Sequence, residues 1–415
     1  MMKWFVSFLF IGAICVLLSP EKKALSFEGD QNEFPMILVH GLGGWGKEEV
    51  KGFNYWGGLR DIEADLNQNG FETHVASIGP VSSNWDRAAE LYAYLRGGTV
   101  DYGAAHAQEH QHDRFGKTYP GVLDEWDDTN KVHLIGHSMG GQTSRMLGEL
   151  LKSGSVEEQE FHEANPEGEE MSPLYAGGKD WIHSITTIGT PHNGSAVTDE
   201  AGEFVPFLKK FVWKYISLAD YYTNDYFNYN FDLDHWGLKR RSGESLSAYV
   251  DRLFANSFWE TADTSQYDLT TVGAKELNDF MKTYDDVYYF SYTGDATYDS
   301  IFTSYRIPLL SMNPILHPAG YLLGRYDNSE FGIDSTWYAN DGLVSVPSSQ
   351  YPSGHPAKKV NVDNPEIGVW NYHDTLYRWD HIDFVGIDLA DTLGLSDIHA
   401  FYKEIATNLA ALPSN

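Results

Sequence analysis

Short runs of apolar residues, each followed by glycine or polar residues, recur along the chain and predict buried strands. Residues 35–40, 132–136, 182–188 and 287–292 form four such runs. Directly after the second run, residues 139–151 place methionine and leucine side chains at helical spacing. Buried strands that alternate with helices are typical of a mostly parallel sheet covered by helices on both faces, so the pattern predicts an α/β fold.

One segment departs from this pattern. The stretch of about residues 200–230 is amphipathic and very rich in aromatic residues. It fits either an ordinary packed helix or a lid that covers a binding site and opens. We find no internal repeat and no long linker, so the 415 residues predict one domain with insertions.

Composition narrows the class of protein. Hydrophobic residues make up 42% of the chain, which is enough for a large packed core. The formal net charge of -30 disfavours nucleic acid as a partner, and also docking on anionic membranes through basic patches. Cys15 is the one cysteine of the sequence, so we expect no disulfide.

The first residues predict a signal peptide. Lys3 supplies a short basic region, and residues 4–18 form an apolar run that is short for a membrane span. Ala24 and Ser26 are small residues at the usual cleavage positions. We therefore expect a signal peptide over residues 1–26, a secreted, extracellular protein from residue 27 onward, and no integral membrane span.

The strongest local motif is Gly136-His137-Ser138-Met139-Gly140, which is G-x-S-x-G between a predicted strand and a predicted helix. Small residues two positions before and after the serine let the backbone turn sharply and expose the hydroxyl. This context predicts that Ser138 is a catalytic nucleophile.

A serine alcohol needs a histidine base, and the histidine needs a carboxylate that fixes its tautomer. With this motif the chain order is serine, acid, histidine. Asp341, in a tight Asn-Asp-Gly turn, and His381 satisfy this order and are favoured. The alternatives are His355 and His373 as bases and Asp334 and Asp374 as acids.

The tetrahedral intermediate of such a reaction needs two N–H donors, which form the oxyanion hole. One is expected from the residue after the nucleophile, Met139. The other is expected from an early glycine-rich loop after a strand, and residues 40–44 fit, with Leu42 as the donor.

Two groups of residues are candidate metal ligands. His106 and His112 lie in a polar segment downstream of Asp86, and they are either surface histidines or part of a closed, structural zinc site. Asp383 and Asp388 follow the candidate base closely, and their carboxylates suit calcium.

Beyond these motifs, the chain resembles the large secreted lipases of the Bacillus, Geobacillus and Staphylococcus type nearly from end to end after the signal peptide. The matching stretches are residues 35–42, 53–58, 82–86, 97–106, 114–121, 135–142, 187–194, 233–238, 267–269, 340–342 and 380–381.

The resemblance implies an α/β-hydrolase fold and a triacylglycerol lipase that works through an acyl-enzyme. The residues it implies are Ser138, Asp341 and His381 as the catalytic triad, and Leu42 and Met139 as oxyanion donors. It implies structural zinc on Asp86, His106, His112 and Asp263, and structural calcium on Asp383, Asp388 and the carbonyls of Ser311 and Leu389. The zinc site would lie in an insertion of about residues 69–120 that is joined by residues 230–265.

The sequence departs from the family at several of these positions. Met139 and Leu42 stand where the thermophilic branch has glutamine and phenylalanine, which leaves the backbone donors intact. Asp383, Ser311 and Leu389 stand where the family commonly has glutamate, glycine and proline. The expected substrate is a lipid or ester at an oil–water interface, and the oligomeric state, monomer or weak dimer, stays open. The alternatives are a carboxylesterase, a phospholipase, or an inactive binding protein on a hydrolase fold.

Overall fold

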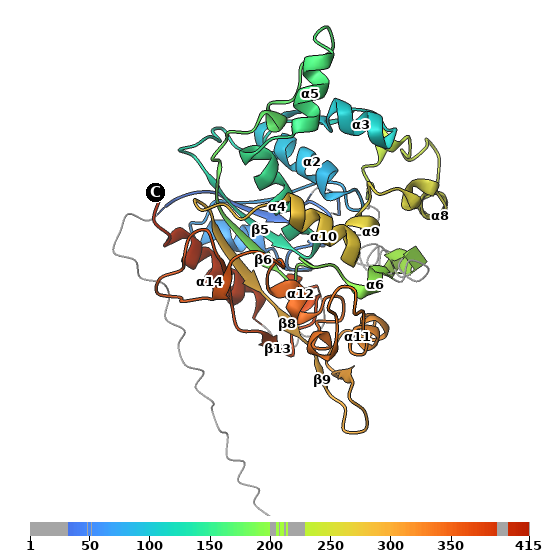
Figure 1. The fold of residues 1–415 in the computed structure, drawn as a ribbon, viewed down its shortest axis with the longest axis vertical. Helices are drawn as coiled ribbons and strands as arrows, with labels where there is room; N and C mark the ends of the chain where they lie inside the picture. The colour runs from blue at the N-terminus through green and yellow to red at the C-terminus, as the bar shows by residue number, and fades with distance from the viewer. Residues whose placement is uncertain are drawn as a thin grey trace, which may run out of the picture.

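The computed structural model describes residues 32–47, 49–50, 52–199, 205–206, 208–210, 213–214, 229–387 and 397–414 (Figure 1). The predicted signal peptide of residues 1–26 lies outside the described residues, as does most of the predicted lid of residues 200–230. No helix among the residues described is long and apolar enough to cross a membrane.

A seven-stranded sheet forms the centre of the molecule. Its strands follow the order β11-β12-β7-β6-β5-β1-β2, and each neighbouring pair is parallel. The bounds are β1 (Met36–Val39), β2 (Thr73–Val75), β5 (Val132–His137), β6 (Ile182–Ile188), β7 (Tyr288–Tyr292), β11 (Ala357–Lys359) and β12 (Trp370–Tyr372). The four apolar runs of the sequence are therefore strands of one parallel sheet, as predicted.

The side chains of strand β1 alternate between two hydrophobic cores. In β1, Met36 and Leu38 pack in one hydrophobic cluster, whereas Ile37 and Val39 pack in the other. Helices α1 (Ile62–Gln68) and α14 (Ile398–Ala410) supply the first cluster, and α2 (Asn84–Arg96) and α4 (Met139–Lys152) supply the second. The continuous apolar runs thus reflect strands that are covered on both faces.

The remaining elements surround this sheet (Figure 1). They are β3 (Gly98–Asp101), α3 (Ala104–His110), β4 (Phe115–Tyr119), α5 (Val156–Ala164), η1 (Pro173–Ala176), α6 (Ala196–Asp199), η2 (Asp234–Trp236), α8 (Leu246–Phe254), η3 (Ser257–Glu260), α9 (Ser265–Asp268), α10 (Thr271–Phe280), β8 (Gly294–Asp295), β9 (Thr297–Asp299), β10 (Arg306–Pro308), α11 (His317–Leu323), η4 (Ser335–Trp337), α12 (Val346–Gln350), β13 (Leu376–Tyr377) and η5 (Asp383–Val385).

Residues 69–120, the predicted insertion, contain two kinds of structure. β2 belongs to the main sheet, and α2 packs on α4 in the layer that covers it. Residues 98–119 lie outside the main sheet, where β3 and β4 form an antiparallel pair beside α3. His235 joins this part through its carbonyl, which accepts a hydrogen bond of 2.9 Å from the Asp113 N–H.

Candidate active site and metal centre

Ser138 occupies a sharp turn between β5 and α4. Its φ of 55° and ψ of -132° lie in a region that residues with a side chain rarely adopt. The turn closes because its flanking glycines carry no Cβ atom. A Cβ at Gly140 would lie 2.1 Å from the Val39 carbonyl oxygen, and one at Gly136 would lie 2.4 Å from the Gly141 nitrogen. The G-x-S-x-G spacing is therefore a steric requirement of the turn.

His381 and Asp341 form a buried pair. His381 Nδ1 lies 2.7 Å from Asp341 Oδ2, and the His381 N–H donates to the Asp341 carbonyl at 2.8 Å. The other carboxylate oxygen, Oδ1, accepts from the N–H groups of Leu343 and Val344 at 2.9 and 2.7 Å. A carboxylate only accepts, so His381 carries its proton on Nδ1 and presents Nε2 as a base.

The alternative bases and acids lie elsewhere. His355 is tied to the Thr283 hydroxyl and the Asn278 carbonyl, and His373 stacks on Tyr292 with ring centroids 4.0 Å apart. Asp334 caps η4, and Asp374 pairs with Lys359 at 2.7 Å. None of the four lines the cavity that contains Ser138.

Ser138 and His381 open into one cavity of about 780 Å³, part of which is continuous with solvent. Most of its walls are apolar. The residues that line it are Leu42, Gly43, Trp45, Tyr55, His137, Ser138, Pro191, Ser195, Val197, Thr198, Leu208, Leu269, Leu343, Val344, His381, Ile382, Val385 and Ile387. A cavity of this size and polarity accepts a hydrocarbon chain whose reactive end lies beside the serine.

The predicted oxyanion loop runs directly beside the serine. A Cβ at Gly41 would lie 2.6 Å from Ser138 Cβ, so glycine permits this close approach. Leu42 lines the cavity, while Met139 is buried as the first residue of α4, where helix N–H groups have no acceptor within the helix. Arg87, itself fully buried, donates to the His40 carbonyl and fixes the start of the loop.

A buried chain of hydrogen bonds joins the histidine His381, the turn at Ser138 and the loop of residues 40–44. His137 Nε2 lies 3.0 Å from the His381 carbonyl, and His137 Nδ1 lies 2.7 Å from the Tyr55 hydroxyl. The Tyr55 oxygen accepts from the Gly41 N–H at 3.0 Å. Burial, together with the nearby His381 ring, holds the pKa of His137 well below its usual range. Neutral His137 therefore donates from Nε2 to the carbonyl and accepts the Tyr55 proton at Nδ1.

Four side chains, two of them buried and two partly buried, bring buried ligand atoms close together. Asp86, His106, His112 and Asp263 each offer one atom, and these atoms all lie within 4.8 Å of one another. His106 Nε2 lies 3.3 Å from Asp86 Oδ1 and 3.3 Å from Asp263 Oδ2, and His112 Nε2 lies 3.3 Å from Asp263 Oδ2. None of these atoms has a hydrogen-bond partner, so the group has the composition and spacing of a metal site. All four residues predicted for zinc are thus brought together.

Two further side chains support this group and carried no signal in the sequence. Glu158, on α5, accepts from the N–H groups of Ala104, Ala105 and His106 at 2.7, 3.1 and 2.8 Å and fixes the start of α3. His235 Nε2 lies 3.0 Å from Asp86 Oδ2, the oxygen that faces away from the centre. Both residues come from segments distant in sequence from the ligands they hold.

The predicted calcium residues are described only in part. Asp388 and Leu389 lie outside the described residues. Ser311 is exposed, and Asp383 is buried with its Oδ2 accepting from the Asp380 N–H at 2.7 Å. Of the predicted lid, Leu208 is buried against the cavity, and Val205 and Trp213 pack on the same hydrophobic cluster.

Comparisons with known proteins show what the chain as a whole is similar to. The family model described as "Lipase-like, C-terminal domain" matches residues 32–413. The crystal structure of Staphylococcus hyicus lipase is 38% identical and superposes with a TM-score of 0.79 over 94% of this chain and 98% of that one. EstA from Clostridium botulinum is 42% identical, with a TM-score of 0.85 over 93% of this chain and 89% of that one. These likenesses confirm the predicted α/β-hydrolase fold.

Among curated proteins, a lipase of Staphylococcus epidermidis is 40% identical over 384 residues, which is 91% of this chain. Lipase 1 of Staphylococcus aureus (strain NCTC 8325 / PS 47) is also 40% identical over 384 residues. The chain spans about half the length of these curated relatives, 54% and 55% respectively.

The lack of space beside Gly140 can be tested through protein stability. Gly140→Ala places a methyl group against the Val39 carbonyl and should lower the free energy of unfolding by about 3 kcal/mol or more. Gly148→Ala, in the same helix, is the matched control, because its Cβ would meet nothing closer than 3.4 Å. The control should be neutral or slightly stabilising. Denaturant unfolding compares the two, and equal stability of both variants would contradict the steric account of the turn.

Proposed function

The chain belongs to the lipase-like, C-terminal domain family, and on this basis we propose that it is a serine hydrolase that cleaves carboxylic ester bonds of lipids, as a triacylglycerol lipase. One observation supports the proposal above all others. Ser138, in its strained turn, and His381, bonded to Asp341, line one apolar cavity. A nucleophile, a base with a fixed tautomer and an apolar binding space are what ester cleavage requires.

The reaction follows from the roles of these side chains. His381 Nε2 takes the proton of the Ser138 hydroxyl as its oxygen attacks the ester carbonyl carbon. The N–H groups of Leu42 and Met139 stabilise the oxyanion, and Asp341 stabilises the imidazolium. His381 then passes the proton to the leaving alcohol, which departs with formation of the acyl-enzyme. Water, deprotonated by the same histidine, releases the fatty acid and restores Ser138.

We assign a positioning role to Tyr55 and His137. Their hydrogen bonds connect the Gly41 N–H, at the start of the oxyanion loop, to the carbonyl of the base itself. Small displacements of an oxyanion donor cost rate because the donor must face an oxygen that becomes charged only in the transition state. This network holds the loop and the base in a fixed relation to the serine.

We infer that the metal of the Asp86 group is zinc. Two imidazoles and two carboxylates form a tetrahedral set that leaves no position for substrate, which is typical of structural zinc. Zinc binds nitrogen and oxygen at about 2.0–2.1 Å, so the edge of its tetrahedron is about 3.3–3.4 Å. Three of the six separations among the four ligand atoms are 3.3 Å and agree with that edge, and all six lie within 4.8 Å. Calcium prefers six to eight oxygen ligands at longer distances and fits this set poorly. The ion would stabilise the segment around residues 98–119.

The other predictions stay proposals of the same kind. We propose that the segment of about residues 200–230 covers the cavity, which the burial of Leu208 against it supports. We also propose secretion through a signal peptide at residues 1–26. Calcium at Asp383 and Asp388 stays a prediction.

Replacing the nucleophile tests the proposed function. Ser138→Ala should lower hydrolysis of both emulsified long-chain triacylglycerol and a soluble short-chain ester by at least about 10³-fold, because it removes the attacking oxygen. The parent protein should cleave both substrates in a titration of released acid. If the parent cleaves only the soluble ester, it is a carboxylesterase. Unchanged activity of the variant would overturn the mechanism.

Removing one hydroxyl tests the positioning role. Tyr55→Phe should lower kcat for the soluble ester by about tenfold and change KM by less than about twofold, because the oxyanion contacts form in the transition state. Tyr92→Phe is the control, since this buried hydroxyl has no hydrogen-bond partner. It should leave both constants unchanged. A Tyr55→Phe variant that loses stability but keeps its kcat would reduce the network to a structural role.

Metal removal tests the zinc assignment. A strong chelator should lower the midpoint of thermal unfolding, because metal that binds only the folded chain stabilises it, and zinc rather than calcium should restore it. Asp263→Asn should lower the midpoint and abolish the chelator response. Asp279→Asn, which changes an exposed acid paired with Lys275, should keep the full response. Elemental analysis of the parent should find about one zinc per chain, and a different metal would contradict the assignment.

A further inference from the structure

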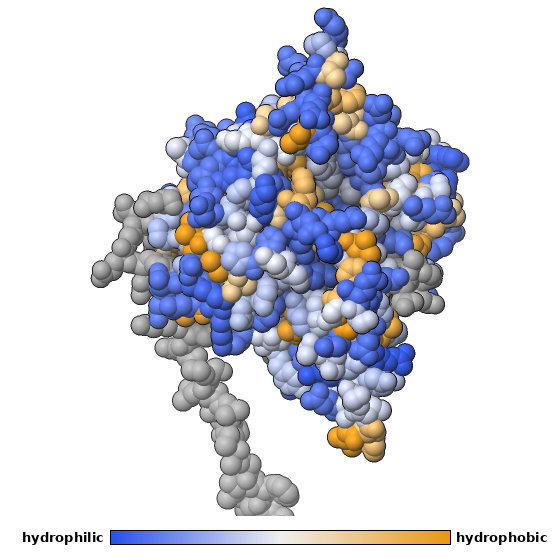
Figure 2. Space-filling model, in the orientation of Figure 1, coloured by the Kyte–Doolittle hydropathy of each residue, from blue (hydrophilic) through white to orange (hydrophobic). Residues whose placement is uncertain are grey.

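A hairpin with an apolar tip projects from the molecule. β9 and β10 pair antiparallel, and residues 300–305 connect them. Ile301 and Phe302 in this connection are 87% and 89% exposed. Figure 1 shows the hairpin beyond α11, at the end of the molecule opposite α5, and Figure 2 shows an apolar cap on this projection. Large apolar side chains that are exposed to water together are unfavourable, and they often indicate a surface that contacts lipid or another molecule.

Four backbone N–H groups of the tip find acceptors within the tip itself. The Ser300 hydroxyl accepts from the N–H groups of Phe302 and Thr303, both at 3.2 Å. The Thr303 hydroxyl accepts from the Tyr305 N–H at 3.3 Å, and the Ser300 N–H donates to the Tyr305 carbonyl at 2.9 Å. An N–H that enters an apolar phase without an acceptor costs several kcal/mol in free energy. These four donors already have acceptors, so these four groups can leave water without that cost.

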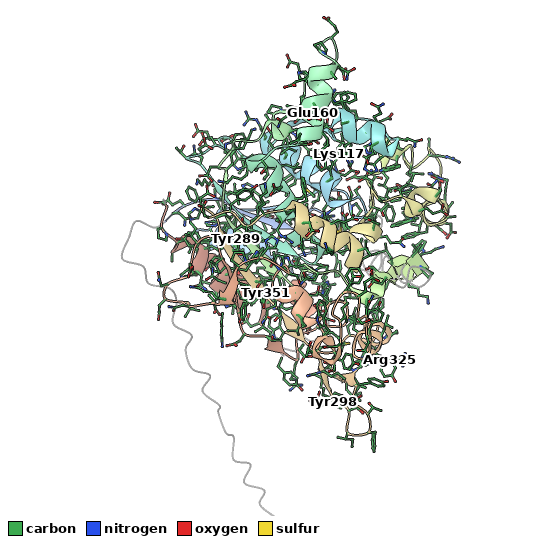
Figure 3. All side chains as sticks on the ribbon, in the orientation of Figure 1. Lys117, Glu160, Tyr289, Tyr298, Arg325 and Tyr351 are labelled. Atoms are coloured by element: carbon green, nitrogen blue, oxygen red, sulfur yellow. The ribbon has the colours of Figure 1, made fainter. Side chains whose placement is uncertain are left out.

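The apolar tip ends where charged and aromatic residues begin. Residues 300–305 carry no charge. Arg306, the first residue of β10, turns back to Asp295 at 2.8 Å and stays with the body of the protein. Tyr298 and Tyr305 lie behind the tip and are 41% and 38% exposed; Figure 3 labels Tyr298 at this end. Tyrosines between an apolar tip and a charged body are typical of segments that enter a lipid surface.

The base of the hairpin is bonded to the residue that precedes Asp341. The Ala296 N–H donates to the Asn340 carbonyl at 2.9 Å, directly before Asp341, and the Leu309 N–H donates to the Ala296 carbonyl at 2.8 Å. Leu310, just beyond the hairpin, is 97% exposed. The hairpin is therefore attached at its base beside the acid of the proposed site, and its apolar tip lies at its far end.

We propose that the tip of this hairpin, residues 300–304 with the side chains of Ile301 and Phe302, inserts into an uncharged or zwitterionic lipid surface and holds the enzyme on it. This inference rests on the proposed cleavage of lipid esters. The net charge of -30 excludes a strongly anionic surface as the preferred partner, because the body of the protein would be repelled from it. The tip supplies an attachment point whose apolar contact does not depend on charge.

The test compares a double variant of the tip with a matched control in the full chain. Ile301→Ser with Phe302→Ser removes the two exposed side chains of the tip. Val156→Ser with Val272→Ser removes two apolar side chains that are 60% and 45% exposed on α5 and α10. Binding is measured by flotation with a triolein emulsion stabilised by phosphatidylcholine, with Ser138→Ala added so that the surface stays intact.

The tip variant should bind the emulsion about tenfold or more weakly than the parent, and the control variant should bind as the parent does. In the Ser138 background, the tip variant should lose a similar factor in emulsion hydrolysis and keep kcat/KM for the soluble ester within about twofold.

Other outcomes overturn the proposal. Equal emulsion binding by the tip variant and the parent contradicts insertion. A parent that sediments as a dimer, with a monomeric tip variant and unchanged emulsion binding, would make the tip a contact between two copies of the chain. A parent that binds the emulsion through the tip but cleaves no ester would refute the proposed function and leave the lipid contact standing.

Discussion

The sharp turn at Ser138 is the constraint on which the other parts of the structure depend. It requires a serine backbone in the left-handed region and glycine at both flanking positions, where no Cβ atom fits. β5 has parallel neighbours on both sides, so the connections after β1, β5 and β6 leave the sheet at one edge. The oxyanion loop follows β1 and can approach the serine only because Gly41 also lacks a side chain. The lack of a Cβ atom at Gly41, Gly136 and Gly140 therefore lets the reacting groups come together.

Buried hydrogen bonds then fix the relative positions of the loop, the histidine and the serine. Tyr55, His137 and the backbone of His381 are removed from water, and each buried donor among them must find an acceptor. Neutral His137 with its proton on Nε2 pairs with both the His381 carbonyl and the Tyr55 hydroxyl, and burial favours the neutral form. The cost of leaving any member unpaired makes the arrangement of loop, base and serine a single state.

The sequence predicts the parts of this molecule that follow from local periodicity or from one strict motif. The strands, helix α4 and Ser138 belong to this class, since apolar runs and glycine spacing are properties of neighbouring residues. Chain order admits the alternatives as well, and Asp341 and His381 are favoured by a tight turn beside an apolar run and by a late position in the chain; the structure separates them from the alternatives by burial. Asp263 was reached only through the family resemblance, because 150 residues separate it from the other ligands. Tyr55 and the tip at Phe302 gave no signal, because the partners of a tyrosine and the exposure of a turn depend on the tertiary fold.

Helix α2 connects the metal centre to the oxyanion loop through adjacent residues. Asp86 is one of the four candidate metal ligands, while the next residue, Arg87, donates to the His40 carbonyl and, at 2.9 Å, to the Thr143 hydroxyl of α4. A buried guanidinium reaches these acceptors only if the start of α2 is fixed, and a metal ion on Asp86 would fix it from the other side. A metal bound at this group would then act on the proposed oxyanion loop without contacting substrate. The four candidate ligands and the proposed oxyanion loop are therefore connected through two neighbouring residues of α2.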